Sequence, residues 1–412
     1  MAVPRITVNG RDYGAGDEPV VVVCVDGGAA EYHDEAIAAG RMPFFTKLLA
    51  DGTSLAADCA MPSFTNPNNL SIATGAPPAV HGICGNYIYD RETGEEVMMN
   101  DPRWLRAPTL FASYADAGAK VAVITAKDKL RRLLGVGLEN GIRFSAEHAD
   151  TVTMADHGIE DVLGLVGKPL PSVYSADLSE LVMAAGVRVL ERDRPDIMYL
   201  SLTDYIQHKH APGSATANDF YAMLDSYYEQ LDALGAVLAV TADHGMNAKS
   251  DEAGEPNVVY VQEHLDRWLG TAKARTILPI TDPYTVHHGA LGSYANVYLP
   301  DDADQTDVAR RLGGLDGVDL VLTAAEACER FELPLDRTGD LVLITAADVA
   351  VGTTPDRHDL SQLDEPLRSH GGLSEQQVPL VLNRTVSGIP HDHGLRNYDA
   401  YWVATNFAEP RR

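Results

Sequence analysis

The sequence contains few cysteines, and no two of them are spaced as in a C-x-x-C motif. Only four occur in 412 residues: Cys24, Cys59, Cys84 and Cys328. This scarcity excludes a disulfide-rich secreted scaffold and a cysteine-based zinc site, and it favours a reduced, cytoplasmic chain. Any metal ion in this protein must therefore be held by aspartate, histidine and hydroxyl groups.

Basic residues are also scarce. The chain has 32 lysines and arginines against 59 acidic residues, which gives a net charge of −27. A protein that binds nucleic acid through its phosphates needs a basic surface, so this balance argues against a nucleic-acid partner. An anionic substrate would need local positive charge, from metal ions or lysines, to overcome the overall field.

Long hydrophobic runs are absent as well. No apolar segment approaches the ~20 residues that span a bilayer, and residues 1–16 lack the apolar core of a signal peptide. We therefore expect no membrane partner and no secretory targeting. The hydrophobic content of 45% is nevertheless enough for a large buried core.

Strand-like apolar runs alternate with helix-like segments along most of the chain. The expected strands span residues 20–25, 120–125, 197–203, 236–241 and 378–383. The expected helices span residues 42–50, 178–191 and 218–234. This alternation predicts βαβ units and an α/β fold with a mainly parallel central sheet. From 255 to 368 the runs are shorter and interrupted by turns, so we expect an inserted mixed α/β cap on a core formed by residues 1–254 and 369–412.

Three of the expected strands end in residues that can bind metal ions. Asp26 follows the first strand, Asp204 follows the third, and Asp243-His244 follows the fourth. His208 lies four residues after Asp204, which places both side chains on one face if the segment turns helically. Open α/β sheets place their chemistry outside the carboxyl ends of their strands, so these residues form one candidate site.

Two further residues complete the candidate set. His370 precedes a Gly-Gly pair and the last expected strand, and Thr65 lies where a loop enters a helix that should stop at Gly75. A hydroxyl at a helix N-terminus suits a nucleophile or a bound phosphate, although a plain N-cap is the alternative interpretation. Mixed aspartate and histidine ligands suit zinc, and also manganese or iron.

A pair of lysines follows the second expected strand. Lys127 and Lys129 would point to one face in an extended chain, where two ammonium groups could bind a carboxylate. The alternative interpretation is a solvated surface pair on either side of Asp128.

The ordered set of ligand-type residues resembles the alkaline phosphatase superfamily, and within it the nucleotide pyrophosphatase/phosphodiesterase-like branch. The resemblance implies two Zn²⁺ ions, with Mn²⁺ or Fe²⁺ as substitutes, and Thr65 as the nucleophile. The implied ligands of one ion are Asp204, His208 and His370, and those of the other are Asp26, Thr65, Asp243 and His244.

Longer stretches resemble the members of this branch that cleave carbon–phosphorus bonds. They span residues 63–75, 81–86, 125–129, 282–289 and 369–373, so the resemblance covers nearly the whole chain. It implies that Asn86 contacts the phosphoryl oxygens, that Lys127 and Lys129 bind the other end of the substrate, and that His208 also contacts it. The roles of His287 and His288 in the cap stay open.

The expected reaction is hydrolysis of a small anionic phosphonate that carries a carboxylate, through a phosphothreonine. A phosphodiesterase or phosphomonoesterase with the same metals is the nearest alternative, and a non-catalytic protein that binds metal or phosphonate is an alternative of another class. Lys127 and Lys129 favour phosphonate hydrolysis, because an esterase has no obvious need for two ammonium groups opposite the phosphoryl site. A homodimer remains open.

Overall fold

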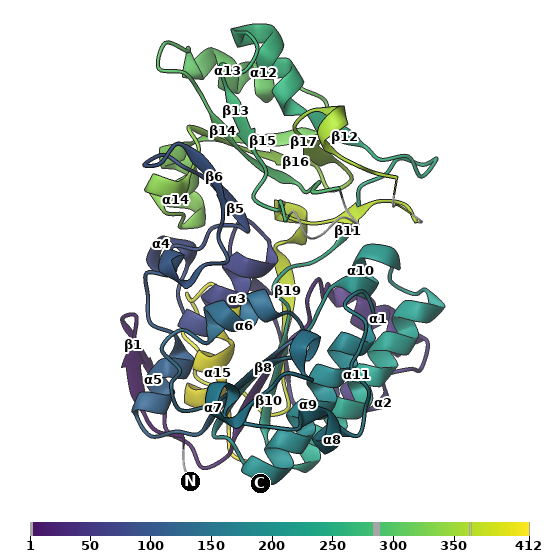
Figure 1. Cartoon of the computed structure of the whole chain (residues 1–412). Helices are drawn as coiled ribbons and strands as arrows, with labels where there is room; N and C mark the ends of the chain where they lie inside the picture. The colour runs from purple at the N-terminus through teal and green to yellow at the C-terminus, as the bar shows by residue number, and fades with distance from the viewer. Residues whose placement is uncertain (1–2, 283–288, 362, 364, 412) are drawn as a thin grey trace.

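The computed structural model describes residues 3–282, 289–361, 363 and 365–411, and its core is built on a seven-stranded sheet (Figure 1). The strands are, in spatial order, β4 (Thr53–Asp58), β19 (Gln377–Leu382), β10 (Val237–Thr241), β3 (Val20–Cys24), β9 (Ile197–Ser201), β7 (Val121–Thr125) and β8 (Ile142–Ser145). The five strands from β10 to β8 are parallel, whereas β19 is antiparallel to both of its neighbours. The mainly parallel α/β core predicted from the sequence is confirmed.

The central strands are rich in β-branched residues because both of their faces are covered. In β3 every residue is buried, so the strand is a continuous apolar run without polar alternation. Successive side chains still point to opposite faces. Val20 and Val22 contribute to one hydrophobic cluster, and Val21 and Val23 to another.

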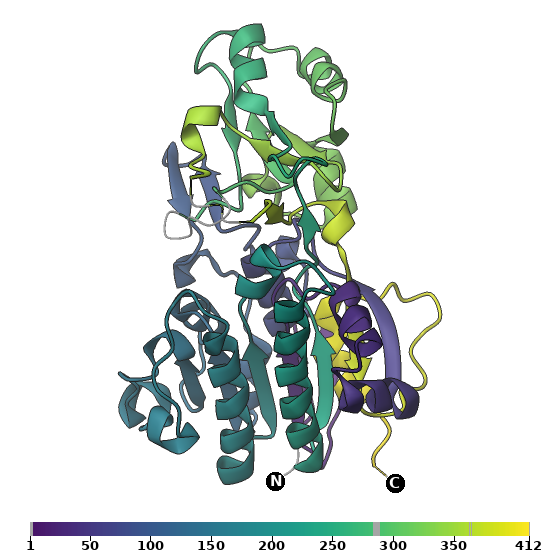
Figure 2. The same ribbon diagram turned by 90° about the vertical axis from the view of Figure 1, so that its right-hand side faces the viewer.

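Helices cover the two faces of the sheet (Figures 1 and 2). One face carries α1 (Ala30–Ala38), α2 (Pro43–Asp51), α9 (Asp177–Asp193) and α11 (Ala215–Ala233). The other carries α3 (Thr65–Thr74), α5 (Leu110–Asp116), α6 (Asp128–Leu134) and α15 (Ala400–Asn406). The helix expected at 218–234 begins earlier, at Ala215, because the Ser214 hydroxyl accepts a hydrogen bond from the backbone N–H of Ala217.

A second, four-stranded antiparallel sheet lies above the core in Figure 1. Its strands, in spatial order, are β13 (Arg275–Ile277), β14 (Tyr294–Tyr298), β16 (Leu341–Thr345) and β15 (Val318–Thr323). The helices of this region are α12 (Val261–Leu269), α13 (Gln305–Leu312) and α14 (Ala324–Phe331). All of these elements lie between residues 255 and 368, where we expected a cap. The exact boundaries between core and cap stay a prediction.

A hairpin from the N-terminal part of the chain lies against this second sheet. It consists of β5 (Tyr87–Asp90) and β6 (Glu95–Met98). Arg91, at the turn of the hairpin, forms an ion pair with Asp340 of the cap at 2.8 Å. The cap region is therefore completed by a segment that the sequence assigned to the core.

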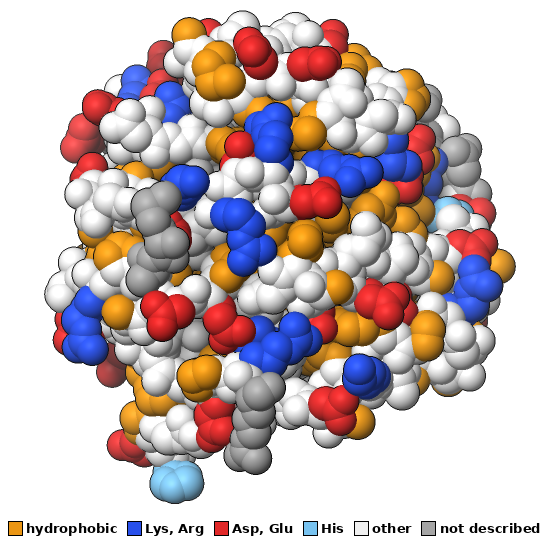
Figure 3. Space-filling view, turned by 90° about the horizontal axis from the view of Figure 1, so that it is seen from below, with side chains coloured by type: hydrophobic (Ala, Val, Ile, Leu, Met, Phe, Trp, Pro, Cys, Tyr) orange, Lys and Arg blue, Asp and Glu red, His pale blue; other side chains and the backbone are white. Residues whose placement is uncertain are grey.

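Short strands and short α-helices supplement these elements, together with several single-turn 3-10 helices. The strands among them are β1 (Ile6–Val8), β2 (Arg11–Tyr13), β11 (Asn247–Ala248), β12 (Val258–Tyr260), β17 (Ala350–Gly352) and β18 (Arg368–Ser369). The α-helices are α4 (Pro78–His81), α7 (Met154–His157), α8 (Val162–Val166) and α10 (Tyr205–Lys209). In the part of the chain that the structure describes, no helix has the length and apolar character that crossing a membrane requires. Figure 3 views the molecule of Figure 1 from below and shows acidic and basic side chains interspersed on this face.

Candidate metal centre

Four neighbouring parallel strands deliver functional side chains to one edge of the sheet. Asp243 follows β10, Asp26 follows β3, Asp204 follows β9 and Lys127 follows β7. These strands lie side by side in that order. Because the carboxyl ends of parallel strands meet at a single edge, residues far apart in sequence form one cluster.

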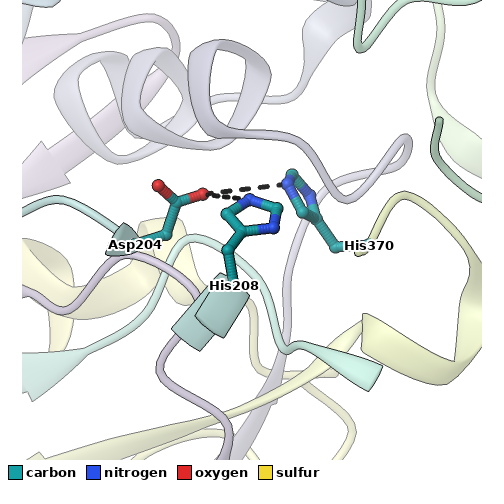
Figure 4. A group of neighbouring side chains, drawn as sticks. All are labelled: Asp204, His208 and His370. Carbon is teal, nitrogen blue, oxygen red and sulfur yellow. Dashed lines mark ion pairs between the residues drawn. The ribbon is translucent and has the colours of Figure 1, made fainter. Parts of the chain in front are cut away.

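The first group of potential ligands consists of Asp204, His208 and His370 (Figure 4). Asp204 is the residue before α10, and His208 lies in the last turn of that helix, so both side chains face the same way. The Asp204 Oδ2 atom is 2.9 Å from His208 Nε2 and 3.9 Å from His370 Nε2. One carboxylate and two imidazoles thus converge as zinc ligands do.

The second group consists of Asp26, Asp204 and His244, whose potential ligand atoms lie within 4.8 Å of one another. The Nε2 atom of His244 is 3.3 Å from Asp26 Oδ1, 3.4 Å from Thr65 Oγ1 and 3.9 Å from Asp243 Oδ2. Asp204 belongs to both groups, so the two sets of ligands are adjacent. This is the arrangement that a pair of ions requires.

Each of the three imidazoles is oriented by a hydrogen bond from its other nitrogen. The Nδ1 atoms of His208, His244 and His370 lie 2.8, 2.8 and 2.9 Å from the carbonyl oxygens of Arg368, Gly245 and Ser63, respectively. A carbonyl oxygen only accepts, so Nδ1 carries the proton, and in the neutral ring the Nε2 lone pair faces the carboxylates. An Nε2 lone pair and a carboxylate oxygen that lie 2.9–3.9 Å apart repel each other unless a cation lies between them. The residues present therefore fit a metal ion.

Burial gives a second reason to assign a cation to this cluster. Asp26 is 5% exposed and Asp243 is fully buried, and the Oδ1 atom of Asp26 accepts no hydrogen bond from the described residues. Burial raises the pKa of Asp26 well above its usual value, and the nearby Asp204 and Asp243 carboxylates raise it further. Burial also raises the pKa of Asp243. Buried carboxylates stay ionised only next to a compensating cation, which a bound metal would supply.

The imidazole of His370 is electronically suited to binding a metal. Burial lowers its pKa well below the usual value, and the neighbouring His244 and His208 lower it further. The ring is therefore neutral, as a metal-binding imidazole must be.

Thr65 is the first residue of α3, and its hydroxyl faces the cluster. The residue that precedes the helix is Phe64, and no side chain caps the N-terminus. The alternative in which Thr65 is only an N-cap is therefore wrong. Gly75 ends the helix in the left-handed conformation, with φ 62°, as we expected.

Asn69, which the sequence analysis missed, holds one of the carboxylates. Its Nδ2 donates to Asp243 Oδ2 at 3.0 Å and to the Thr65 carbonyl at 3.0 Å. Its Oδ1 accepts from the hydroxyls of Tyr199 and Ser201 at 2.7 and 2.9 Å. Asn69 lies one helical turn after Thr65, and this spacing was the available sequence signal.

A cavity of about 520 Å³ opens beside the cluster. Of the predicted site residues, those that line it are Asp26, Thr65, Asn86, Lys127, Lys129, Asp204 and His370. Asp243, His244 and His208 are buried and lie outside this lining. Contact between His208 and a substrate therefore stays a prediction. Asn86 lines the cavity, where its side chain could contact a substrate, and its Nδ2 donates to the Ile280 carbonyl at 3.4 Å.

The two lysines line the cavity, but only Lys127 has an extended backbone. Lys127 immediately precedes α6 and has φ −108° and ψ 140°, whereas Lys129 lies in the first turn of the helix, so the expected extended geometry is wrong at Lys129. The helix begins here because the N–H of Asp128 donates to the Glu147 carboxylate at 2.8 Å. The Asp128 side chain is in turn held by Arg131, at 2.6 Å.

The environments of the two ammonium groups differ. Lys129 Nζ lies 2.9 Å from both carboxylate oxygens of Asp282, a cap residue to which the sequence analysis gave no role. Lys127 Nζ donates to the Val173 carbonyl at 2.9 Å and lies 5.5 Å from the centre of the Tyr174 ring. Burial lowers the pKa of Lys127. His287 and His288 lie outside the described residues.

Comparison with known proteins places these features in a family. The family model for type I phosphodiesterase/nucleotide pyrophosphatase matches residues 20–373. The chain therefore belongs to this family, as the sequence analysis predicted. The expectation of a hydrolase is confirmed by the similarities to named hydrolases that follow.

Within that family the chain is similar to phosphonoacetate hydrolase. The structures of the enzyme from Sinorhizobium meliloti 1021 in complex with phosphonoformate and with phosphonoacetate are 56% identical to it, with a TM-score of 0.94. The similarity covers 98% of this chain and 99% of that enzyme. The predicted resemblance is confirmed.

More distant or partial matches add less. A 30-residue stretch, 7% of this chain, is 77% identical to a phosphonoacetate hydrolase from Penicillium oxalicum and spans 42% of that protein. Murine ectonucleotide pyrophosphatase/phosphodiesterase 5 is 18% identical, with a TM-score of 0.63 over 96% of this chain and 97% of its own. That likeness shows the fold alone.

Proposed function

We propose that this protein hydrolyses the carbon–phosphorus bond of phosphonoacetate and releases acetate and phosphate. One observation carries the proposal: a single cavity is lined by Thr65, by Asp26, Asp204 and His370 of the metal-ligand cluster, and by the two lysines. A phosphonate with a carboxylate one carbon from phosphorus has matching charges at both ends. The similarity to an enzyme solved with phosphonoacetate supports the assignment.

Seven residues would hold two Zn²⁺ ions, with Mn²⁺ or Fe²⁺ as substitutes. Asp204, His208 and His370 form one set of ligands, and Asp26, Thr65, Asp243 and His244 form the other. Bound there, the ions would supply Lewis acidity, lowering the pKa of coordinated hydroxyls and neutralising the phosphonate oxygens.

The reaction then proceeds in two steps, with Thr65 as the nucleophile of the first. Thr65 Oγ gives its proton to water and attacks phosphorus, so an O–P bond forms as the C–P bond breaks. The electron pair of the C–P bond passes to the methylene carbon and delocalises onto the carboxylate as an enolate, which a proton from water converts to acetate. Water then attacks the phosphorus of phospho-Thr65, and phosphate leaves as the threonine hydroxyl is restored.

Charge stabilisation at the two ends of the substrate makes this breakdown feasible. Asn86, at the edge of the cavity, can donate to a phosphonate oxygen as negative charge develops. Lys127 and Lys129 also line the cavity, and they would stabilise the charge at the other end, where the enolate forms. Donors that are fixed before the reaction stabilise such charge without having to reorganise.

The test of this function is a comparison of substrates. Phosphate release would be measured with zinc-loaded protein on phosphonoacetate, on phosphonates that lack the carboxylate, and on aryl phosphate mono- and diesters. We expect phosphonoacetate to have the highest kcat/KM. Higher values for an ester would assign the protein to the phosphodiesterase or phosphomonoesterase activities, and absence of turnover on every substrate would indicate a binding protein.

The cysteines and the expected substrate bear on the location and partners of the enzyme. The four cysteines are free thiols, which supports a cytoplasmic location, where the substrate would be a small anionic phosphonate. We propose no nucleic-acid or membrane partner, and a homodimer remains open to measurement by light scattering.

A further inference from the structure

The two loops that carry His244 and His370 are joined by a short antiparallel ladder. After His244 the chain enters β11, and just before His370 it passes through β18. These strands pair antiparallel, with Asn247 opposite Ser369. A ladder of two residues per strand is too short to fix the loops by itself, since isolated two-stranded pairs are marginal.

A buried carboxylate, Glu375, makes further bonds to both loops. Its Oε1 accepts from Asn247 Nδ2 at 2.6 Å, and its backbone carbonyl accepts from the N–H of Gly245 at 2.8 Å. Its Oε2 accepts from the N–H of Gly372 at 2.9 Å. Gly245 follows His244 directly, and Gly372 lies two residues after His370, so Glu375 contacts the backbone next to a ligand in each loop.

Lys249 supplies the counter-charge. Its Nζ lies 2.8 Å from Glu375 Oε1 and donates to the Ala347 carbonyl, in the cap, at 2.7 Å. Neither side chain of this ion pair is exposed to solvent. A buried pair of this kind is costly to break, because either partner alone becomes an uncompensated charge.

The connection extends to the loop that precedes the nucleophile. The hydroxyl of Ser63 donates to the Gly372 carbonyl at 2.8 Å, and the carbonyl of Ser63 accepts from His370 Nδ1 at 2.9 Å. Ser63 lies two residues before Thr65. The loop held by Glu375 is thus also bonded to the start of the helix that bears Thr65.

We infer that the buried Glu375–Lys249 pair is a positioning device for the metal centre: it sets the separation of the His244 and His370 loops. The inference rests on the proposed metal site and assigns no contact with substrate to either residue. Glu375→Gln would replace a carboxylate oxygen by an amide N–H, which would face Lys249 or Gly372, both donors. The loops would then shift apart, and the ligand geometry would loosen.

The test measures zinc binding to purified, folded protein by competition with a chelating dye. Glu375→Gln should weaken zinc binding by about 10- to 100-fold, the range typical of residues that orient metal ligands. Its Co²⁺-loaded form should show an altered ligand-field spectrum. Lys249→Met/Glu375→Gln buries no lone charge, so it should recover much of the thermal stability while zinc binding stays at least tenfold weak. This double variant carries the test if the single variant does not fold.

Arg384→Met is the matched control. Arg384 is 4% exposed and forms an ion pair with Glu18 at 2.9 Å, and it bonds to the Ala236 carbonyl, beside the start of β10 and away from the metal cluster. Its loss should lower Tm and leave zinc affinity unchanged. Zinc affinity within twofold of wild type in the double variant, with an unaltered Co²⁺ spectrum, would overturn the inference. Failure of the wild-type protein to bind zinc would instead overturn the proposed metal site.

Discussion

The imidazole rings of His244 and His370 stack face to face, with centroids 3.6 Å apart and planes 7° from parallel. One ring precedes the cap in sequence and the other follows it, so the cluster is complete only after the chain has returned to the core. The Nε2 atom of His244 lies 3.3 Å from the buried Asp26 carboxylate, and that of His370 lies 3.9 Å from the partly buried Asp204 carboxylate. The proposed cation between these nitrogen and oxygen atoms would therefore stabilise this part of the fold.

Metal removal should consequently affect both activity and stability. Exhaustive chelation should abolish phosphate release and lower Tm, because an ion that binds only the folded state stabilises it. Added Zn²⁺ should restore both, whereas Ca²⁺, which prefers oxygen ligands, should not. Calorimetry and a phosphate assay on the same samples provide the measurement. Full turnover in protein shown by elemental analysis to contain no metal would contradict the mechanism.

Thr65→Ala should remove the nucleophile while leaving the aspartate and histidine ligands in place. We expect kcat to fall by roughly 10³-fold or more, as for other essential nucleophiles, with zinc still bound. Thr65→Ser, which keeps the hydroxyl, serves as the control and should retain part of the activity. Near-wild-type turnover in the alanine variant would show that water attacks phosphorus directly.

Asn69→Leu tests whether the orientation of Asp243 matters for catalysis. The variant loses the bond to Asp243 and leaves the hydroxyls of Tyr199 and Ser201 without their acceptor. We expect a 10- to 100-fold loss of zinc affinity or kcat and a stability cost of about 1–3 kcal/mol. Ser201→Ala is the matched control, because it removes one donor to Asn69 and keeps the bond to Asp243. Equal effects of the two variants on kcat would count against a positioning role.

The strand-end residues of the candidate metal site could be predicted because local sequence encodes their positions. Apolar runs that stop at Asp26, Asp204 and Asp243 indicate parallel strands whose ends meet, and the i to i+4 spacing of Asp204 and His208 needs only one helical turn. Their assembly followed from sheet topology alone.

Other contacts depend on tertiary structure and left no local signal. Asp282 reaches Lys129 from the cap, and Glu375 reaches Lys249 from the other side of the insertion. The helical backbone at Lys129 depends on Glu147, far along the chain, whose carboxylate accepts from the N–H of Asp128. No pattern in a single sequence reports such pairings.

His81 should make the protein less stable in acid. The residue is fully buried: its Nδ1 accepts from the N–H of Ile83 at 3.1 Å, and its Nε2 lies 2.9 Å from Ser71 Oγ. Burial lowers its pKa from 6.5 to about 3. Between these values the unfolded chain binds a proton that the folded protein does not, so the free energy of unfolding falls as pH falls, by up to ~1.4 kcal/mol per pH unit.

Urea unfolding at several pH values between 7 and 4 checks this expectation. His81→Gln, which does not titrate, should be less stable than wild type at pH 7 but should lose less stability on acidification. The difference in slope between the two proteins isolates this histidine from the other titrating groups. Parallel pH profiles would show that His81 does not carry the effect.

The lysine pair should determine specificity for the carboxylate-bearing substrate. Lys127→Ala and Lys129→Ala should each lower kcat/KM for phosphonoacetate far more than for an aryl phosphate ester, by roughly 10-fold or more for each lost charge contact. Only phosphonoacetate develops enolate charge at this end of the cavity. A lysine that stabilises the enolate lowers kcat when removed, whereas one that only binds the carboxylate raises KM.

Asp282 complicates the interpretation of Lys129→Ala and also supplies its control. Without the ammonium group, the Asp282 carboxylate would repel any anionic substrate, so activity on esters would fall as well. Lys129→Ala/Asp282→Ala removes both charges and should restore ester hydrolysis while phosphonoacetate cleavage stays impaired. The ratio of the two specificity constants, measured in each variant, decides the matter. If both substrates recover equally in the double variant, Lys129 serves only to neutralise Asp282, and recognition of the substrate carboxylate falls to Lys127.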